Sequence, residues 1–250
     1  MGGTHTIEQT AGVTPGTWEN GALIRVRELS RIYYQGEIEV HALRGTDLDI
    51  GEGEFTALAG PSGSGKTTLL NVIGALDRPT SGRVEVAGRD ITGLDKGQAA
   101  EFRLNTVGFI FQAYNLVPVL SAYENAEFTL LLRGMSATER RALVEPLMER
   151  VGLVDMMHRK PHELSGGQQQ RAAIVRALAT SPRIVLADEP TANLDSETSG
   201  SLLDLMLELN AELGTTFVFS THDPAVIERA RRLVELLDGR VHRDSVSAVA

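Results

Sequence analysis

Gly60-Pro-Ser-Gly-Ser-Gly-Lys-Thr67 matches the pattern G-x-x-x-x-G-K-[ST] at every fixed position. In such a loop, successive backbone N–H groups surround phosphate oxygens and the lysine adds a positive charge. The apolar run before it, Phe55–Ala59, suits a buried strand, and Lys66–Ile73 has apolar residues at helical spacing. The loop should therefore join a strand to a helix N-terminus, which favours anions. This segment predicts an α/β protein that binds a nucleoside triphosphate.

Composition limits the class of protein. With 250 residues and 42% hydrophobic content, the chain can bury a large core, and one α/β domain with an inserted lobe fits best. The absence of cysteine excludes disulfides and thiolate metal sites and agrees with a reducing compartment. The sequence has neither a membrane-length apolar stretch nor a signal-peptide pattern. We therefore expect a soluble, cytoplasmic protein.

Charge argues against nucleic acid as a partner. The formal net charge is -9, whereas binding to a phosphate backbone needs clustered lysine and arginine. The short clusters Arg140-Arg141 and Arg231-Arg232 are interpreted as solvated helix faces. We expect no nucleic-acid partner.

The N-terminal part of the chain is predicted to contain a tail and an antiparallel sheet. Residues 1–21 are rich in glycine and threonine and are interpreted as a flexible tail, with a second short tail at 243–250. The domain should cover residues 22–242. Extended segments that alternate with glycine-containing turns, as antiparallel strands do, lie at 23–29, 46–50, 55–59 and 83–87.

The middle of the chain is predicted to be helical. After a strand at 107–111, residues from about 113 to 180 have mostly helical spacing. Ser121-Ala-Tyr-Glu124 and Ser136-Ala-Thr-Glu139 match the S-x-x-E capping box, so helices should begin there. Pro146 should kink or split the second helix, because proline removes a backbone hydrogen bond. We expect a helical subdomain inserted between strands.

The last third of the chain should return to the sheet. Apolar runs at 184–187 and 217–219 flank an amphipathic segment at 201–213, which predicts strand, crossover helix and strand. Both strands are apolar throughout, as in a parallel sheet covered by helices. Residues 233–242 should form a hairpin around the tight turn at Asp238-Gly239.

Polar residues that end these strands are the candidates for chemistry, because ligands of open α/β sheets bind at that edge. Asp188 is expected to hold Mg²⁺ beside phosphate ligands. Glu189, which should point elsewhere, is expected to take a proton from the attacking water. Gln112 and His222 follow their strands in the same way, where a γ-phosphate and its metal would lie.

Leu164-Ser-Gly-Gly-Gln168 predicts a second anion site. Ser165 and Gln168 fit a capping box, so a helix should begin there. The glycines Gly166 and Gly167 allow a ligand to approach its N-terminus closely. Two phosphate sites of this kind can hold one γ-phosphate from both sides.

Together these motifs resemble an ABC-type ATPase. The segments that look like its Walker A, Q-loop, signature, Walker B, D-loop and H-loop are 60–67, Gln112, 164–168, 184–189, Ala192-Asn-Leu-Asp195 and His222. The resemblance covers nearly all of residues 23–242. It implies a P-loop NTPase fold with a mixed central sheet, an N-terminal antiparallel β subdomain and an inserted α-helical subdomain. It also implies a head-to-tail homodimer that sandwiches two ATPs.

The motifs and the resemblance together assign the site residues. Those expected to contact ATP are Tyr33, Gly60, Pro61, Ser62, Gly63, Ser64, Gly65, Lys66, Thr67, Thr68, Gln112, Ser165, Gly166, Gly167, Gln168 and Asp195. Those expected to act in catalysis are Glu189, His222, Lys66 and Gln112, and those expected at Mg²⁺ are Thr67, Gln112 and Asp188. By the resemblance Tyr33 would stack on adenine, and the neighbouring Tyr34 is the alternative.

A finer resemblance concerns the subfamily. Gly36-Glu-Ile-Glu-Val-His-Ala-Leu43, residues 108–118 and Gln168-Gln-Gln-Arg171 look like the lipoprotein-releasing and macrolide- or peptide-exporting ATPases, which serve FtsX-like permeases. This implies a protein that is peripheral on the inner face of the cell membrane. The apolar segment 117–132, with Tyr123, is either internal packing or a groove for the permease.

Two alternatives belong to other functional classes. A cell-division-type regulatory ATPase, which signals through a permease-like partner, would look the same in this sequence. A DNA-maintenance ABC ATPase would need a long coiled-coil insertion, and the predicted lobe is too short for one.

Overall fold

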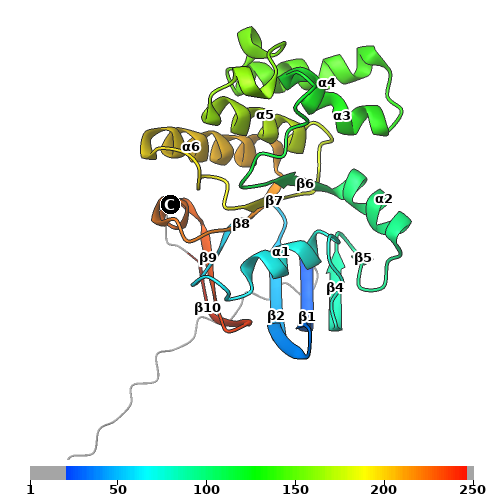
Figure 1. Cartoon of the computed structure of the whole chain (residues 1–250), viewed down its shortest axis with the longest axis vertical. Coiled ribbons are helices and arrows are strands. Elements are labelled where there is room, and N and C mark those ends of the chain that lie inside the picture. Colours follow the sequence, from blue (N-terminus) through cyan, green and yellow to red (C-terminus); the bar gives the residue numbers. More distant parts are fainter. Residues whose placement is uncertain (1–20, 247–250) are drawn as a thin grey trace, which may run out of the picture.

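The structure, a computed structural model, describes residues 21–246. The expected tail at 1–21 therefore lies outside the described residues except for residue 21, and half of the expected tail at 243–250 lies outside them. Within this range the strands form two sheets. A lobe of helices and the smaller sheet lie on opposite sides of the larger sheet (Figure 1). No helix among residues 21–246 is both long and apolar enough to cross a membrane.

The N-terminal sheet is antiparallel, in the order β2-β1-β4-β5. Its strands are β1 (Ala22–Gln35), β2 (Ile38–Gly51), β4 (Ser81–Val86) and β5 (Arg89–Asp90). The segments predicted at 23–29 and 46–50 are too short, since β1 and β2 are each 14 residues long. The outer half of this hairpin is largely exposed, so its sequence lacks the apolar alternation of a half-buried strand.

The central sheet is mixed, in the order β10-β9-β3-β8-β7-β6. Its strands are β3 (Phe55–Ala59), β6 (Val107–Ile110), β7 (Ile184–Asp188), β8 (Thr216–Ser220), β9 (Arg232–Leu237) and β10 (Arg240–Val246). The prediction that placed residues 55–59 among antiparallel strands is wrong, because β3 pairs in parallel with β8 and β9. All residues of β3 are buried, as expected of a central parallel strand.

The hairpin of β9 and β10 turns at Asp238 and Gly239, which both have positive φ, as predicted. The start predicted for the C-terminal tail, residue 243, is too early, because β10 continues to Val246. Asp244 in this extension binds Arg232, which was wrongly interpreted as part of a solvated helix face. Arg232 as a whole residue is 7% exposed, and its guanidinium also binds Glu54 at 3.0 Å. Burial lowers the pKa of Arg232, but Asp244 and Glu54 raise it more.

The helices outside the lobe are α1 (Lys66–Ile73), α2 (Lys96–Thr106), α6 (Ser196–Leu213) and α7 (Pro224–Arg229). The helix predicted at 201–213 begins five residues earlier than expected, at Ser196, directly after its cap Asp195. Neither α2 nor α7 was predicted. Each begins with a signal in the sequence: Asp95 and Gln98 form a capping box before α2, and Asp223 caps α7 with proline at its first position.

The inserted lobe consists of α3 (Ala122–Leu132), α4 (Ala137–Arg150), η1 (Val154–Met156), η2 (Pro161–Glu163) and α5 (Gly166–Leu178). The capping boxes at Ser121 and Ser136 are confirmed. Pro146 does not split α4, which continues through it. Val144 and Met148, on either side of the proline, are fully buried, and this packing holds the helix together.

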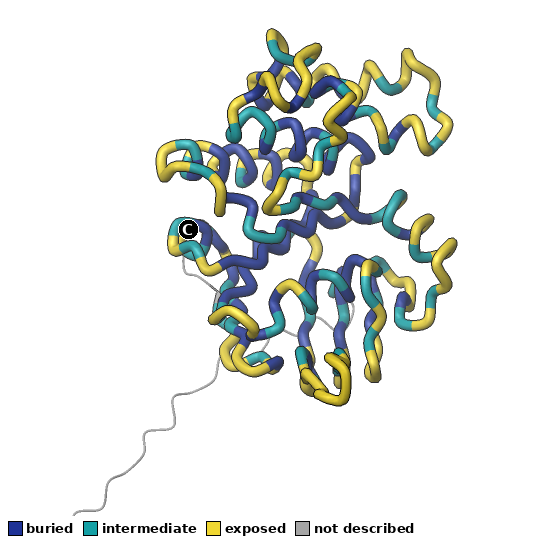
Figure 2. The backbone as a smooth tube through the Cα atoms, viewed as in Figure 1, coloured by how far each residue is buried: buried dark blue, intermediate teal, exposed yellow. Residues whose placement is uncertain are grey.

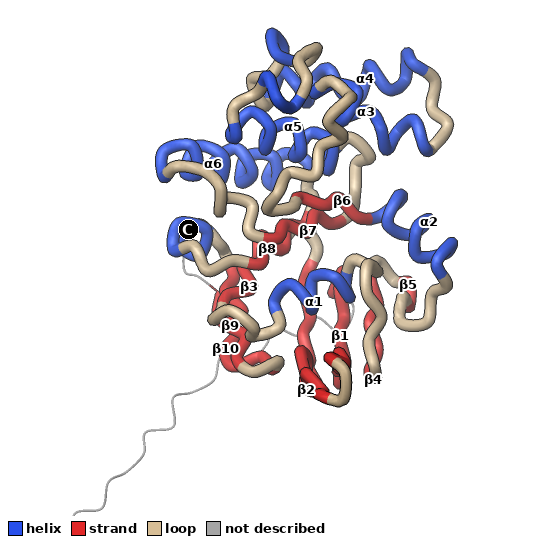
Figure 3. Tube along the Cα trace, viewed as in Figure 1, coloured by secondary structure: helices blue, strands red, loops and turns tan. Residues whose placement is uncertain are grey.

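The buried residues form two cores on the two faces of the central sheet. One joins the sheet to α5, α6 and the lobe, and the other joins it to α1 and the N-terminal sheet. Strands β3 and β8 at the centre of the sheet are buried throughout, while much of the lobe and of the hairpin of β1 and β2 is exposed (Figure 2). Strands β3, β6, β7 and β8 are parallel, so their C-terminal ends meet at one edge of the sheet, where loops follow (Figure 3).

Candidate functional site

The glycine-rich loop joins β3 to α1 and is pressed against two other strands. Gly60 and Gly65 have φ of 146° and 103°, which side chains rarely adopt. A Cβ atom on Gly60 would lie 2.2 Å from the carbonyl oxygen of Leu236, and one on Gly65 would lie 2.5 Å from that of Ala42. The loop path therefore depends on glycine at both positions.

Lys66, the first residue of α1, is 8% exposed. Its Nζ donates to the carbonyl oxygens of Gly60 at 2.8 Å and Pro61 at 3.0 Å, so the ammonium lies over the loop. The buried Oγ of Ser64 has no hydrogen-bond partner within the described part of the chain. An ammonium and a free hydroxyl beside a helix N-terminus suit the oxygens of a phosphate.

The two carboxylates at the end of β7 have different partners. Asp188 Oδ1 accepts a hydrogen bond from Thr67 Oγ1 at 3.0 Å, so it faces the phosphate loop. Glu189 has φ of 48°, and its N–H donates to the carbonyl of Ser220 at 2.9 Å. Its Oε1 lies 2.7 Å from Nδ1 of His222. Because the backbone turns at Glu189, the two neighbouring carboxylates reach different partners, and we expect them to have different roles.

Eleven of the predicted residues line one pocket of about 630 Å³, whereas Gly60, Pro61 and Asp188 are not part of its lining. Its lining consists of Tyr33, Val40, His41, Ala42, Ser62, Gly63, Ser64, Gly65, Lys66, Thr67, Thr68, Gln112, Glu189 and His222. Tyr33 lines the pocket, whereas Tyr34 is 67% exposed and does not. Val40, His41 and Ala42 were not predicted. They reach the pocket because Val40 pairs with Tyr33 across the hairpin, and this register is not apparent in the sequence. Phosphate-binding groups beside a carboxylate and a histidine suit phosphoryl transfer to water.

The hard oxygen donors beside the loop fit a magnesium ion. Thr67 supplies a hydroxyl, Asp188 a carboxylate and Gln112 a side-chain amide. Mg²⁺ prefers such oxygens, and it is usually held by one or two carboxylates plus phosphate oxygens and water. Among the described residues no cluster of three or more histidine or acidic side chains offers an all-protein metal site.

The second anion motif lies outside this pocket. Ser165 caps α5 and forms the capping box with Gln168, whose backbone N–H donates to Ser165 Oγ at 3.3 Å. Ser165 is exposed, and neither it nor Gly166, Gly167, Gln168 or Asp195 lines the pocket around Lys66. The exposed helix N-terminus of one chain is thus separate from its own phosphate loop.

Asp195 and the two glycines have structural contacts of their own. The Asp195 carboxylate accepts from the N–H of Thr198 at 2.9 Å as the cap of α6. A Cβ on Gly167 would lie 2.7 Å from the methyl of Thr198, and one on Gly166 would lie 2.9 Å from the hydroxyl of Tyr114. The second motif is therefore packed tightly against the loop that follows β6 and the first turn of α6.

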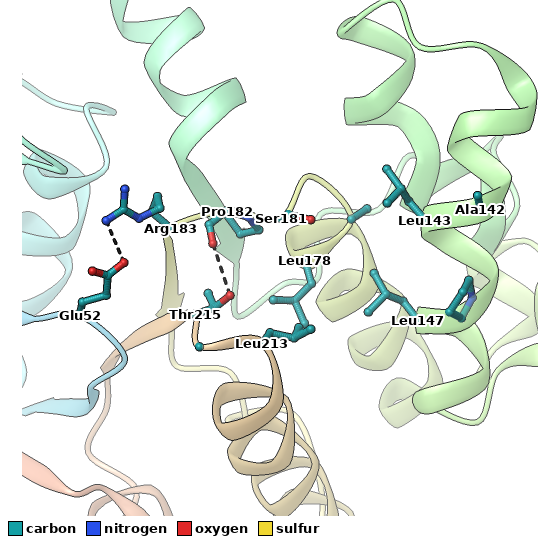
Figure 4. Close-up of a pocket in the computed structure, with 13 residues that line it drawn as sticks. Glu52, Ala142, Leu143, Leu147, Leu178, Ser181, Pro182, Arg183, Leu213 and Thr215 are labelled. Atoms are coloured by element: carbon teal, nitrogen blue, oxygen red, sulfur yellow. Dashed lines mark hydrogen bonds and ion pairs between the residues drawn. The ribbon is translucent and has the colours of Figure 1, made fainter.

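A separate cavity of about 440 Å³ lies between α4, α5 and the end of α6. Figure 4 shows Leu143, Leu147, Leu178 and Leu213 around it, with the ion pair of Arg183 and Glu52 at one side. It contains none of the predicted site residues. The chemistry belongs to the pocket at the loop edge of the sheet.

Comparison with known proteins supports this interpretation. The family model for ABC transporters matches residues 43–192. The lipoprotein-releasing system ATP-binding protein LolD of Anaeromyxobacter dehalogenans is 50% identical over 85% of this chain and 89% of its own length. The macrolide export ATP-binding/permease protein MacB 1/2 of Paracoccus denitrificans is 49% identical over 90% of this chain, which spans 34% of that protein.

A solved structure has the same fold. The ATP-binding cassette MJ0796, in a dimeric post-hydrolysis state bound to ADP and Pi, matches with a TM-score of 0.83 at 42% identity, covering 89% of this chain and 98% of that one. The fold and the family match agree with the pocket at the edge of the sheet. This chain belongs to the ABC transporter family and is an ATP-binding subunit that hydrolyses ATP.

Proposed function

We propose that two copies of this chain close around two ATP molecules and drive an FtsX-like permease that exports lipoproteins, peptides or related molecules. Each ATP would lie between residues 60–67 of one copy and 164–168 of the other, on the inner face of the membrane. The relatives named for lipoprotein release and macrolide export support the transport role. The dimeric cassette bound to ADP and Pi supports the paired arrangement.

The chain's own residues account for hydrolysis. Lys66 neutralises charge on the transferring phosphoryl group, and Thr67, Asp188 and Gln112 would hold Mg²⁺, which supplies further charge neutralisation when bound. Glu189 takes a proton from the attacking water. His222, 2.7 Å from Glu189, holds that carboxylate in place from the end of β8.

The observation that carries the coupling role is that two neighbouring residues, Phe111 and Gln112, line two different cavities. Gln112 lines the nucleotide pocket, and its chain neighbour Phe111 lines a groove of about 530 Å³ between α2, α3, α5 and β6. Arg176, which also lines the groove, donates to the carbonyl oxygens of Tyr114 at 2.8 Å and of Asn115. A partner in the groove would therefore contact the segment that carries Gln112.

The groove is apolar and accessible, as a helix-binding surface should be. Leu132 lines it and is 61% exposed, and Leu131 beside it is 50% exposed. Tyr123, for which internal packing and a permease surface were both considered, is partly buried against the core of the lobe. We propose that the permease docks at the end of α3, and that the beginning of α3 serves packing.

Replacing Leu132 by arginine is expected to lower recovery of a co-expressed FtsX-like permease with the tagged chain by about ten-fold, because a charge enters an apolar contact. Basal ATPase activity of the purified chain should stay unchanged. Leu213→Arg is the matched control, since Leu213 is 49% exposed and lies outside the groove. Loss of the permease with Leu213→Arg but not with Leu132→Arg would place the docking surface elsewhere.

Replacing Gly60 by alanine is expected to weaken ATP binding by about ten-fold or more, because the added methyl displaces the loop from β9. Gly88→Ala is the matched control. Gly88 also has positive φ, but a Cβ there would meet no atom within 4 Å, and the residue lies outside the nucleotide pocket. Titration with a fluorescent ATP analogue measures both. Equal losses in the two variants would show that strain at a positive-φ glycine, not the contact with Leu236, causes the loss.

A further inference from the structure

Tyr33, the aromatic residue of the nucleotide pocket, is held by a network of polar side chains. Its hydroxyl donates to Asp77 Oδ2 at 2.6 Å. Arg31, two residues earlier on β1, binds both oxygens of the same carboxylate at 2.8 and 2.9 Å. The Arg31 guanidinium also lies over the Tyr33 ring, 4.4 Å from its centroid. Three side chains thus form a closed triangle.

This triangle restricts the ring in two ways. The hydroxyl bond fixes the far end of the side chain, so the ring cannot swing about its bond to the backbone. The guanidinium covers one face, which leaves the other face for a ligand, and a cation over one face is an attractive contact in itself. The side chains of Arg31 and Asp77 are each 23% exposed, so water competes with the ion pair only in part.

Asp77 ties this aromatic residue to the phosphate loop. It follows α1, the helix whose N-terminus carries Lys66, and its N–H donates to the carbonyl of Asn71 in that helix at 3.1 Å. Its carboxylate also accepts from the backbone N–H of Arg78 at 2.8 Å. Burial raises the pKa of Asp77, but hydrogen bonds from Tyr33, Arg78 and Arg31 together lower it below its ordinary value. The carboxylate is therefore ionised near neutral pH, as the ion pair requires.

The rest of the hairpin offers little support to the ring. Beyond Tyr33 the exposed fractions of Tyr34, Ile38 and Val40 are 67%, 67% and 40%. A backbone bond from Ile32 to the hydroxyl of Thr80, at 3.0 Å, anchors the strand but not the side chain. The position of the ring relative to α1 is therefore set by Asp77.

We propose that Asp77 and Arg31 are positioning residues that hold Tyr33 as a platform for the adenine base at a fixed distance from the phosphate loop. This inference rests on the proposed contact between Tyr33 and the base. A platform fixed to the same helix that binds the phosphates lets both ends of ATP bind without first ordering the hairpin. Loosening the platform should weaken recognition of the base and leave recognition of the phosphates intact.

The test compares ATP with tripolyphosphate, which has phosphates but no base. Asp77→Asn and Tyr33→Phe should each raise the KM for ATP by about five-fold. Tyr33→Phe removes the hydroxyl that donates to Asp77, and Asp77→Asn removes the charge that pairs with Arg31 and one of the two accepting oxygens. The kcat should change by less than about two-fold, since the phosphate groups still bind correctly. The affinity for tripolyphosphate should not change. The double variant should be little worse than either single variant, because both break the same contact.

A second ion pair, which also uses an arginine of β1, provides the matched control. Arg27 binds both oxygens of Asp49 at 2.6 and 2.7 Å, and the Asp49 side chain is 30% exposed, against 23% for Asp77. Neither residue lines the pocket. Asp49→Asn should leave both affinities unchanged, which would show that the loss of an ion pair on this sheet is not sufficient to disturb ATP binding.

Three other outcomes would overturn the proposal in distinct ways. If Asp77→Asn weakens ATP and tripolyphosphate equally, Asp77 supports α1 and not the base platform. If Tyr33→Ala weakens ATP binding but Tyr33→Phe and Asp77→Asn do not, the ring contacts the base without needing the triangle. If Tyr33→Ala leaves ATP affinity unchanged, the proposed base contact is wrong and this inference falls with it.

Discussion

Replacing Glu189 by glutamine is expected to lower the rate of ATP hydrolysis by about a hundred-fold or more while ATP stays bound. The amide has the same shape as the carboxylate, so it can keep the contact with His222 at 2.7 Å. It cannot take a proton from water, so the attacking hydroxide does not form. Because hydrolysis is what removes the ligand that favours the closed state, the variant should accumulate as an ATP-bound dimer.

Phosphate release and size-exclusion chromatography with ATP measure the two halves of this result. Glu197→Gln is a suitable control, because Glu197 is an exposed acid in the first turn of α6 and does not line the pocket. It should hydrolyse ATP at the rate of the unmodified chain. Normal turnover by Glu189→Gln would show that another group accepts the proton. A variant that stays monomeric with ATP would contradict the closed dimer.

The sequence predicts the chemistry of this site better than the shape of its surroundings. The functional side chains closely follow short apolar runs that become strands, as Lys66, Asp188, Glu189 and His222 do. Parallel strands bring the residues at their C-terminal ends together at one edge of the sheet. Helix starts are local as well, which is why the capping box at Ser121 predicts α3 correctly.

What the sequence does not predict depends on contacts between distant residues. Phe55–Ala59 has the composition of any buried strand, and its parallel pairing with β8 and β9 is fixed by residues more than a hundred positions away. Asp77 shows no motif, yet it binds Tyr33 across 44 positions. Pro146 is a strong local signal for a break in the helix, but packing of the lobe against distant residues keeps α4 continuous there.

Ser165 lies outside the pocket around Lys66 of its own chain, so in a dimer each hydrolysis site should need Lys66 from one copy and Ser165 from the other. A chain with Lys66→Ala lacks the charge that binds the phosphates, and a chain with Ser165→Arg places a bulky cation at the N-terminus of α5. Each variant alone should lose about a hundred-fold or more of its hydrolysis, since groups that stabilise the transition state are missing from both sites of the dimer.

Mixing the two variants should restore hydrolysis to about a quarter of the unmodified level, because about half of the dimers are mixed and each has one site with an intact Lys66 from one copy and an intact Ser165 from the other. Phosphate released in a single turnover is the appropriate measurement, since one intact site suffices for it. Native mass spectrometry confirms that mixed dimers form. If they form and the mixture is as inactive as its components, Lys66 and Ser165 do not act across the dimer. If Ser165→Arg alone retains full activity, the N-terminus of α5 has no part in hydrolysis.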